Sequence, residues 1–123
     1  MIKLLELLPD KELTLYHVTT SDVAKQISDS GFDPKSTIDY KYYSALGKEG
    51  IYFYEDMRSS QRYAYFLGSK KPNESLSLIT VKVPKNAVLK TNKLEDGVFV
   101  PNDRLNDVKI VSVKRISKIS DMY

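Results

Sequence analysis

The chain has 123 residues, the size of one domain, and 41% of them are hydrophobic, which is enough to bury a core. Its 19 basic and 16 acidic residues give a formal net charge of +3, without the concentrated basic stripe of a dedicated nucleic-acid binder. The absence of cysteine excludes disulfides, thiolate metal sites and a cysteine nucleophile, and one histidine excludes a site with two imidazoles. No apolar run approaches the ~18 residues of a membrane span, and charge interrupts the first one too soon for a signal peptide. We therefore expect a single cytoplasmic domain over residues 1–123 with no membrane partner.

The first predicted strand and helix surround the only histidine. Residues 13–17 alternate between two faces as a strand does, and His17 shares the face of the leucines. A helix follows, which Thr20 or Ser21 caps and Gly31 ends. We therefore expect His17 at a strand end beside a helix start, a place where binding residues are common.

The next segment, residues 33–48, has no clear period and predicts a long loop. Loops of that length in compact domains are usually functional or mobile. Residues 50–53 then predict a short buried strand. Asp56 or Ser59 caps a second helix, which we expect to run to about Phe66.

Strands dominate the second half of the chain. We predict strands at residues 75–83, 87–89, 98–100 and 108–113, with a turn at 101–103. Because the predicted helices lie in the first half of the chain and strands dominate the second half, the pattern favours an α+β fold over a regular βαβ alternation.

Imidazole and hydroxyl groups gather where the first strand meets the first helix. His17 is either a half-buried strand residue with one hydrogen bond or a group aimed at a ligand hydroxyl. Thr19 and Thr20 either cap the helix or hold a ribose or phosphate oxygen beside its free N–H groups.

Two further groups carry candidate chemistry. Ser60 and Tyr63 are three residues apart on the second predicted helix and share a face. Together with Tyr52, these residues have two interpretations. They are ordinary surface residues of a chain that has nine tyrosines, or they bind a flat, amide-bearing ring. Glu95 and Asp96 precede a predicted strand. They are either turn residues, or carboxylates that bind a ribose hydroxyl or stabilise positive charge on a sugar carbon.

Two sequence blocks carry a resemblance to known enzymes. The first, residues 15–20, reads Leu-Tyr-His-Val-Thr-Thr and precedes a helix that ends at Ser-Gly-Phe in residues 30–32. The second, residues 47–53, reads Gly-Lys-Glu-Gly-Ile-Tyr-Phe and is followed without a gap by Ser60 and Tyr63. Both blocks resemble the diphtheria-toxin/poly(ADP-ribose) polymerase class of ADP-ribosyltransferases.

The resemblance covers about residues 13–66, with Glu49 as a one-residue insertion, and it implies both fold and activity. The implied fold is an ADP-ribosyltransferase-like split β-sandwich of two small, mostly antiparallel sheets, with flanking helices around an NAD cleft. The implied activity is mono-ADP-ribosyl transfer from NAD, the co-substrate, to a protein or nucleic-acid acceptor, with release of nicotinamide and without a metal. A compact transferase of this kind is similar to bacterial or phage effectors and toxins, which implies an antitoxin or a host target as partner.

The resemblance also implies a role for each matching residue. His17 would hydrogen-bond the ribose on the adenosine side of NAD, and Thr19 would support the same region. Val18 stands where the family usually has Gly, whose backbone grips the nicotinamide carboxamide. The residues that would line the nicotinamide pocket, contact the carboxamide and stack on the ring are Tyr52, Ser60 and Tyr63, respectively.

The family's last motif has a Glu at the start of a strand, and residues 94–100 look similar. The register puts Asp96 at the Glu position, and a one-residue slip puts Glu95 there. The implied catalytic set is therefore Asp96 or Glu95 together with His17 and Tyr52. Because Asp is one methylene shorter than Glu, the chain could instead be a non-catalytic module that only binds NAD or ADP-ribose.

Two more interpretations of the sequence stay open. Residues 96–101 also resemble a segment of the NAD-dependent RNA 2′-phosphotransferases. Those enzymes carry an extra N-terminal domain with an Arg and a His, and this chain has no second His. The second interpretation is a plain interaction domain with coincidental motifs.

Overall fold

The computed structural model describes residues 12–32, 41–43, 49–90 and 97–117. Its helices are α2 (Ser21–Ser30) and α3 (Met57–Lys70), with short 3₁₀ helices η1 (Lys85–Ala87) and η2 (Asn102–Asp107). Its strands are β1 (Glu12–Thr20), β2 (Lys41–Tyr43), β3 (Glu49–Tyr54), β4 (Leu76–Pro84), β5 (Leu89–Lys90), β6 (Gly97–Pro101) and β7 (Lys109–Ile116). The α+β class expected from the sequence is confirmed.

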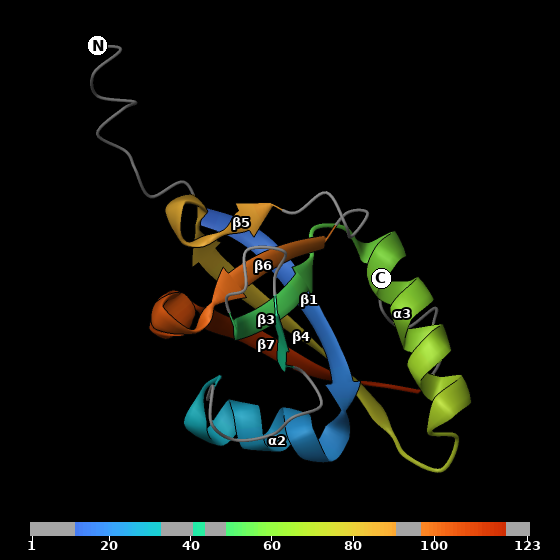
Figure 1. The fold of residues 1–123 in the computed structure, drawn as a ribbon. Helices are drawn as coiled ribbons and strands as arrows, with labels where there is room; N and C mark the ends of the chain where they lie inside the picture. The colour runs from blue at the N-terminus through green and yellow to red at the C-terminus, as the bar shows by residue number, and fades with distance from the viewer. Residues whose placement is uncertain (1–11, 33–40, 44–48, 91–96, 118–123) are drawn as a thin grey trace.

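The strands form an antiparallel sheet that is weakly joined at its centre. The order is β5-β6-β3-β1-β4-β7, with β2 added to β3 (Figure 1). Within the described residues, Tyr16–Tyr54 is the single residue pair between β1 and β3. By contrast, β1 pairs with β4 along its whole length. The sheet therefore has two halves, one of β1, β4 and β7 and the other of β2, β3, β5 and β6.

A large cluster of buried apolar side chains draws on both halves. It includes Leu15, Ile79, Val81 and Val83 from one half, Ile51, Phe53, Val98 and Val100 from the other, and Ala24 and Ile27 from α2. Full burial of one such side chain contributes about 1.5–3 kcal/mol. Apolar packing therefore holds the two halves together where the strand pairing between β1 and β3 stops.

A smaller cluster lies on the opposite face of β1, against α3. It contains Val18, Leu76, Leu78, Ile116 and Ala64, with Tyr16, Met57, Tyr63 and Leu67 packed against it. Successive strand residues point to opposite faces, so Leu15 joins the large cluster while Tyr16 and Val18 join the small one. The helices α2 and α3 consequently cover different faces of β1 (Figure 1).

The helix boundaries follow the predicted signals in part. Gly31 ends α2 with a φ of 78°, which suits glycine, as predicted. Asp56 caps α3, since its Oδ1 accepts from the backbone N–H of Ser59 at 2.6 Å. The predicted end of α3 at about Phe66 is wrong, because the helix continues through Gly68 to Lys70.

Two predictions for the connecting segments also need correction. A loop throughout residues 33–48 is wrong at Lys41–Tyr43, which pair with β3 as strand β2. Residues 33–40 and 44–48 lie outside the described residues. The predicted turn at residues 101–103 is instead the end of β6 followed by the 3₁₀ helix η2.

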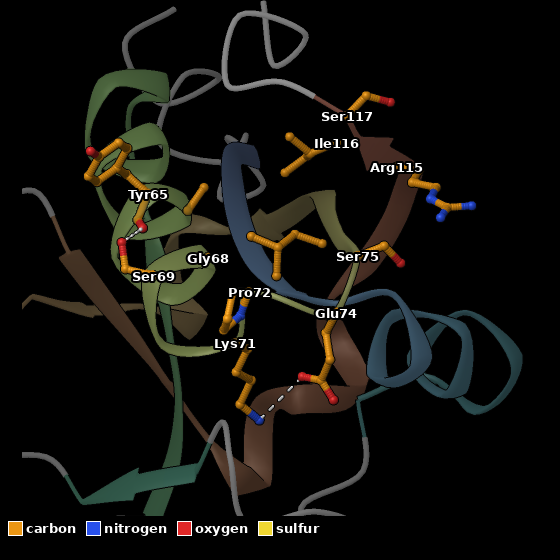
Figure 2. Close-up of a pocket in the computed structure, with 12 residues that line it drawn as sticks. Tyr65, Gly68, Ser69, Lys71, Pro72, Glu74, Ser75, Arg115, Ile116 and Ser117 are labelled. Atoms are coloured by element: carbon orange, nitrogen blue, oxygen red, sulfur yellow. Dashed lines mark hydrogen bonds and ion pairs between the residues drawn. The ribbon is translucent and has the colours of Figure 1, made fainter.

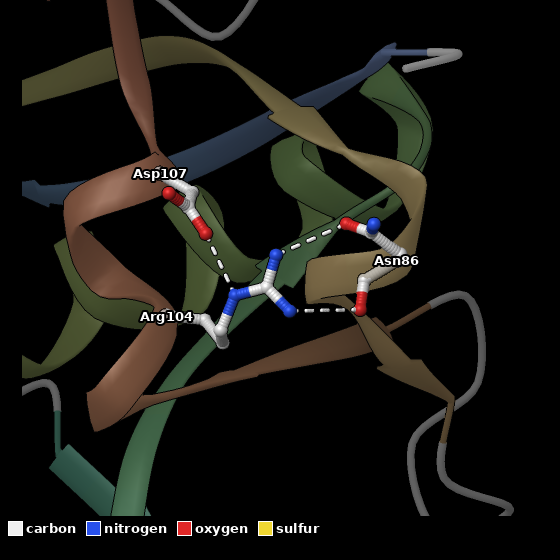
Figure 3. A network of polar contacts seen from close by, with 3 residues as sticks. All are labelled: Asn86, Arg104 and Asp107. Atoms are coloured by element: carbon white, nitrogen blue, oxygen red, sulfur yellow. Dashed lines mark hydrogen bonds and ion pairs between the residues drawn. The ribbon is translucent and has the colours of Figure 1, made fainter. Parts of the chain in front are cut away.

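One side chain ties the two 3₁₀ helices together (Figure 3). The guanidinium of Arg104 donates to Asp107 Oδ2 at 2.7 Å within η2. It also donates to the side-chain oxygen of Asn86 at 3.0 Å and to the Asn86 carbonyl at 3.4 Å, both in η1. The fork geometry of arginine allows one side chain to hold both elements.

Candidate functional site

The imidazole of His17 spans the two halves of the sheet. Its Nδ1 lies 3.2 Å from the carbonyl oxygen of Tyr52 in β3. Because a carbonyl only accepts, Nδ1 carries the proton, and the neutral ring presents Nε2 as an acceptor. The ring is buried at 8% exposure and packs edge-on against Phe32 and tilted against Phe53, with centroids 5.7 and 5.5 Å away.

Burial fixes the charge state of this ring. Desolvation lowers the pKa of His17 from 6.5 to about 4, and the hydrogen bond to the Tyr52 carbonyl opposes this effect only in part. His17 is therefore neutral at pH 7. Such a ring can accept a hydrogen bond from a ligand hydroxyl but cannot act as a cation toward a phosphate.

His17 and Tyr52 meet where β1 and β3 part. The antiparallel register set by Tyr16–Tyr54 would place Val18 opposite Tyr52 if the ladder continued. Instead, the strand pairing stops and the imidazole reaches across. We call this junction, residues 16–19 of β1 and 51–54 of β3, the seam.

The ring of Tyr52 packs against β6 rather than against His17. Its centroid lies 4.8 Å from that of Phe99, which is fully buried on the neighbouring strand. Glycine at position 50 makes this packing possible, because a Cβ there would lie 2.7 Å from the Phe99 ring and closer still to the Val100 carbonyl. Packing against β6 therefore explains the glycine of the Gly-Ile-Tyr-Phe stretch without any ligand.

The helix residues approach the seam from the α3 side. The ring of Tyr63 lies 5.8 Å from Tyr54, and its side chain packs against the cluster that contains Val18. Ser60 is fully buried, and its Oγ donates to the Asp56 carbonyl at 3.0 Å. Since its one proton is used within the helix and no part of the residue is exposed, the structure places Ser60 out of reach of a ligand.

The structure thus brings some predicted residues together and separates others. His17 contacts Tyr52 directly, while Tyr63 reaches the seam beside Tyr54. His17 and Tyr63 lie on opposite faces of β1, since the imidazole contacts Phe53 of the large cluster and Tyr63 packs in the small one. A ligand that touches both would have to cross the seam.

The remaining predicted residues fall into two groups. Thr19 is buried, two residues after His17 on the same strand. Glu95 and Asp96 lie outside the described residues. The chain re-enters the described part at Gly97, which pairs with Tyr54 at the seam.

A separate hollow of about 710 Å³ lies at the C-terminal end of α3 (Figure 2). It was not predicted from the sequence. Its lining comes from the last turns of α3, the segment Lys71–Leu76 and the end of β7, and none of the predicted site residues takes part. The consecutive aromatics Tyr65 and Phe66 near the predicted helix end were the nearest sequence signal, and of the two only Tyr65 lines the hollow. We call this hollow the α3 groove.

The described part of the chain lacks a metal-binding cluster and a membrane-spanning helix. No group of three or more His, Asp or Glu side chains there is placed to hold a metal ion. No helix there is long and apolar enough to cross a membrane.

Comparison of the chain with models of known protein families, with curated proteins and with solved structures finds no match.

Proposed function

We propose that the protein binds NAD across the seam and transfers its ADP-ribose to a macromolecular acceptor. The observation that carries the proposal is the 3.2 Å hydrogen bond between His17 Nδ1 and the Tyr52 carbonyl. It joins two segments that lie 35 residues apart in the chain, and these are the segments whose resemblance implied an NAD site.

The side chains at the seam suit the two ends of a dinucleotide. The neutral His17 ring has an acceptor at Nε2, which is buried, so a ribose hydroxyl would have to reach it within the seam. On the α3 side, Tyr63 offers an aromatic face, while Ser60 is fully buried, so its Oγ would accept from a carboxamide NH₂ only where NAD binding exposes it. The two ends of the ligand would therefore lie on the two faces of β1.

In the proposed reaction, the bond between nicotinamide and ribose breaks and nicotinamide leaves as a neutral ring. Positive charge then develops on the ribose carbon, and a carboxylate beside it would stabilise that charge electrostatically. Asp96, or Glu95 in the shifted register, is the proposed carboxylate. An acceptor nucleophile forms the new bond to the same carbon and loses its proton.

Val18 favours a second candidate, a module that binds NAD or ADP-ribose without catalysis. Its isopropyl group is buried in the same cluster as Ala64, the cluster against which Tyr63 packs. That side chain therefore belongs to the cluster against which the ring that would hold nicotinamide packs. Replacement by Ala should raise the affinity for NAD if that side chain limits binding.

An NAD titration followed by thermal unfolding tests binding first. We expect millimolar NAD to raise the melting temperature of the wild-type chain, because a ligand that binds only the folded state stabilises it. Tyr63→Ala should lose this shift and Tyr63→Phe should keep it, while Val111→Ala, exposed on β7, serves as the control. The absence of any shift in the wild-type chain would contradict both candidates.

Labelled NAD then separates the two candidates. Nicotinamide release and label transfer that disappear in Asp96→Ala or Glu95→Ala support the transferase. A thermal shift without nicotinamide release supports the binding module. If the protein removes phosphate from a 2′-phosphorylated RNA only in the presence of NAD, the phosphotransferase activity replaces both the transferase and the binding module.

A further inference from the structure

The outward side of α3 is positively charged and carries no acid. The helix has 14 residues, among them Arg58, Arg62 and Lys70, and contains neither Asp nor Glu. Arg58 and Arg62 lie one helical turn apart, and Arg62 Nη2 lies 3.3 Å from Ser59 Oγ. This side of the helix therefore carries a row of cations.

Two large aromatic rings stand among these cations. Tyr65 is 72% exposed and Phe66 is 53% exposed, although rings of this size are normally buried to a much greater extent. The ammonium group of Lys70 lies 4.7 Å from the Phe66 ring centre. We call the surface formed by Arg58, Arg62, Tyr65, Phe66 and Lys70 the α3 face.

The α3 face continues in two directions. Toward the seam, the Phe66 ring lies 6.3 Å from Tyr63, which itself lies 5.8 Å from Tyr54. At the other end, Tyr65 is among the residues that line the α3 groove, and its ring points outward from the helix (Figure 2). The surface thus links the groove with the proposed NAD site.

The α3 groove has an apolar floor and a polar rim. Leu76 and Ile116 are buried beneath it. Arg115, on the end of β7, lies on the side opposite Tyr65 (Figure 2). Glu74 Oε2 lies 3.8 Å from Lys71 Nζ, so the one carboxylate of the lining forms an ion pair with a cation of the lining. The groove therefore adds the positive charge of Arg115 to that of the α3 face.

We propose that the α3 face and the α3 groove bind single-stranded nucleic acid. Aromatic faces beside cations suit a strand whose bases are unpaired, since the bases stack on the rings and the phosphates meet the cations. An acidic protein segment would account for the cations but not for two exposed rings. A duplex would match the charge but keeps its base faces hidden. That this strand is also the acceptor of ADP-ribose rests on the proposed function.

Binding is tested without NAD, by fluorescence anisotropy of labelled single-stranded RNA and DNA of about twelve nucleotides, within the ~4–16-nucleotide footprint of small single-strand-binding folds. We expect the single strands to bind at least about tenfold more tightly than the matching duplex. The RNA and DNA arms tell which sugar is preferred. Equal binding of duplex and single strand, or stronger binding of a poly-glutamate peptide, would overturn the proposal.

Substitutions then separate stacking from charge. Tyr65→Ala should weaken binding at least about fivefold, and Tyr65→Phe should retain it, because the ring rather than the hydroxyl stacks. Exchanging both Arg58 and Arg62 for Gln should reduce the slope of log affinity against log salt by about 1.4. Lys25→Gln, an exposed cation on α2, is the matched control and should change neither quantity.

Loss of folding does not account for weaker binding by Tyr65→Ala, because the side chain is exposed, and thermal unfolding of each variant checks this directly. The two proposals fail separately. Nucleic-acid binding without an NAD-induced thermal shift refutes the proposed function but not the α3 face. An NAD shift without nucleic-acid binding refutes the α3 face alone.

Discussion

The ring of Phe99 lies directly over the backbone of Gly50, and their two strands, β6 and β3, pair as neighbours in the sheet. A Cβ at position 50 would meet the Phe99 ring at 2.7 Å and the Cα of Pro101 at 2.8 Å, and backbone atoms cannot move aside cheaply. The strand that carries Tyr52 therefore depends on glycine for close approach to β6.

We expect Gly50→Ala to destabilise the protein by about 1–3 kcal/mol, the usual effect of overpacking a filled interior. Chemical denaturation of both chains measures this difference. Gly68→Ala is the matched control, because the nearest atom to its Cβ would be 3.7 Å away and the position is helical. That variant should be neutral or more stable by up to about 1 kcal/mol. Equal stability of Gly50→Ala and the wild type would contradict the packing described.

The buried imidazole predicts a stability that falls as the pH falls. The folded-state pKa of His17 is about 4, below the unfolded value of 6.5, so the unfolded chain binds more protons between these values. The contribution is fully present above pH 6.5 and is lost as the pH falls toward 4, by about 3 kcal/mol in total. Denaturation midpoints at pH 7.5, 6 and 5 measure it.

A nuclear magnetic resonance titration follows the same proton directly. The chain has one histidine, so its imidazole signal needs no assignment. An apparent pKa near 6.5 in the folded protein would refute the burial of His17. His17→Phe should flatten the stability change between pH 7.5 and 5 relative to the wild type.

The hydrogen bonds from the Arg104 guanidinium to Asp107 and Asn86, here called the Arg104 fork, predict a modest stabilisation of the two 3₁₀ helices. Arg104→Lys should cost about 1 kcal/mol, since a single ammonium cannot reach both Asp107 and Asn86 and the site is partly exposed. Lys71→Ala removes an exposed ion pair of 3.8 Å and should cost less than about 0.5 kcal/mol. A loss for Arg104→Lys no larger than for Lys71→Ala would show that the fork contributes nothing.

The cap of α3 predicts a further stability effect. Asp56→Ala removes the acceptor of the Ser59 N–H and should destabilise the protein by about 1 kcal/mol. Asp56→Asn keeps an acceptor oxygen and should lose less. Thermal unfolding distinguishes the two variants, and identical losses would mean that the charge rather than the hydrogen bond stabilises the helix start.

Local signals predicted several features of this fold correctly. Alternation placed His17 on the face of Leu15, and both side chains do contact the large cluster or its rings. Gly31 and Asp56 mark helix ends because their effect is set by neighbouring backbone groups. Such features need no knowledge of distant residues.

Features that depend on distant packing were not predictable. β1 continues three residues beyond His17 because β4 supplies partners for each of them. α3 passes through Gly68, a residue that costs about 1 kcal/mol in a helix, while Leu67 packs against the small cluster. The opposite placement of His17 and Tyr63 follows from where α3 docks, and no spacing within either motif encodes that choice.

The division of the sheet has a consequence for how the chain reaches its native state. The polypeptide passes back and forth between the halves, with β1 in one, β3 in the other, β4 in the first again, β6 in the second and β7 in the first. Neither half is a continuous stretch of sequence, so each lacks a strand until the chain has reached β6 or β7. Most pairings also join segments far apart in the chain, a pattern associated with slow, cooperative folding. A chain that stops short of β6 would leave both halves of the sheet incomplete, because it lacks β6 and β7.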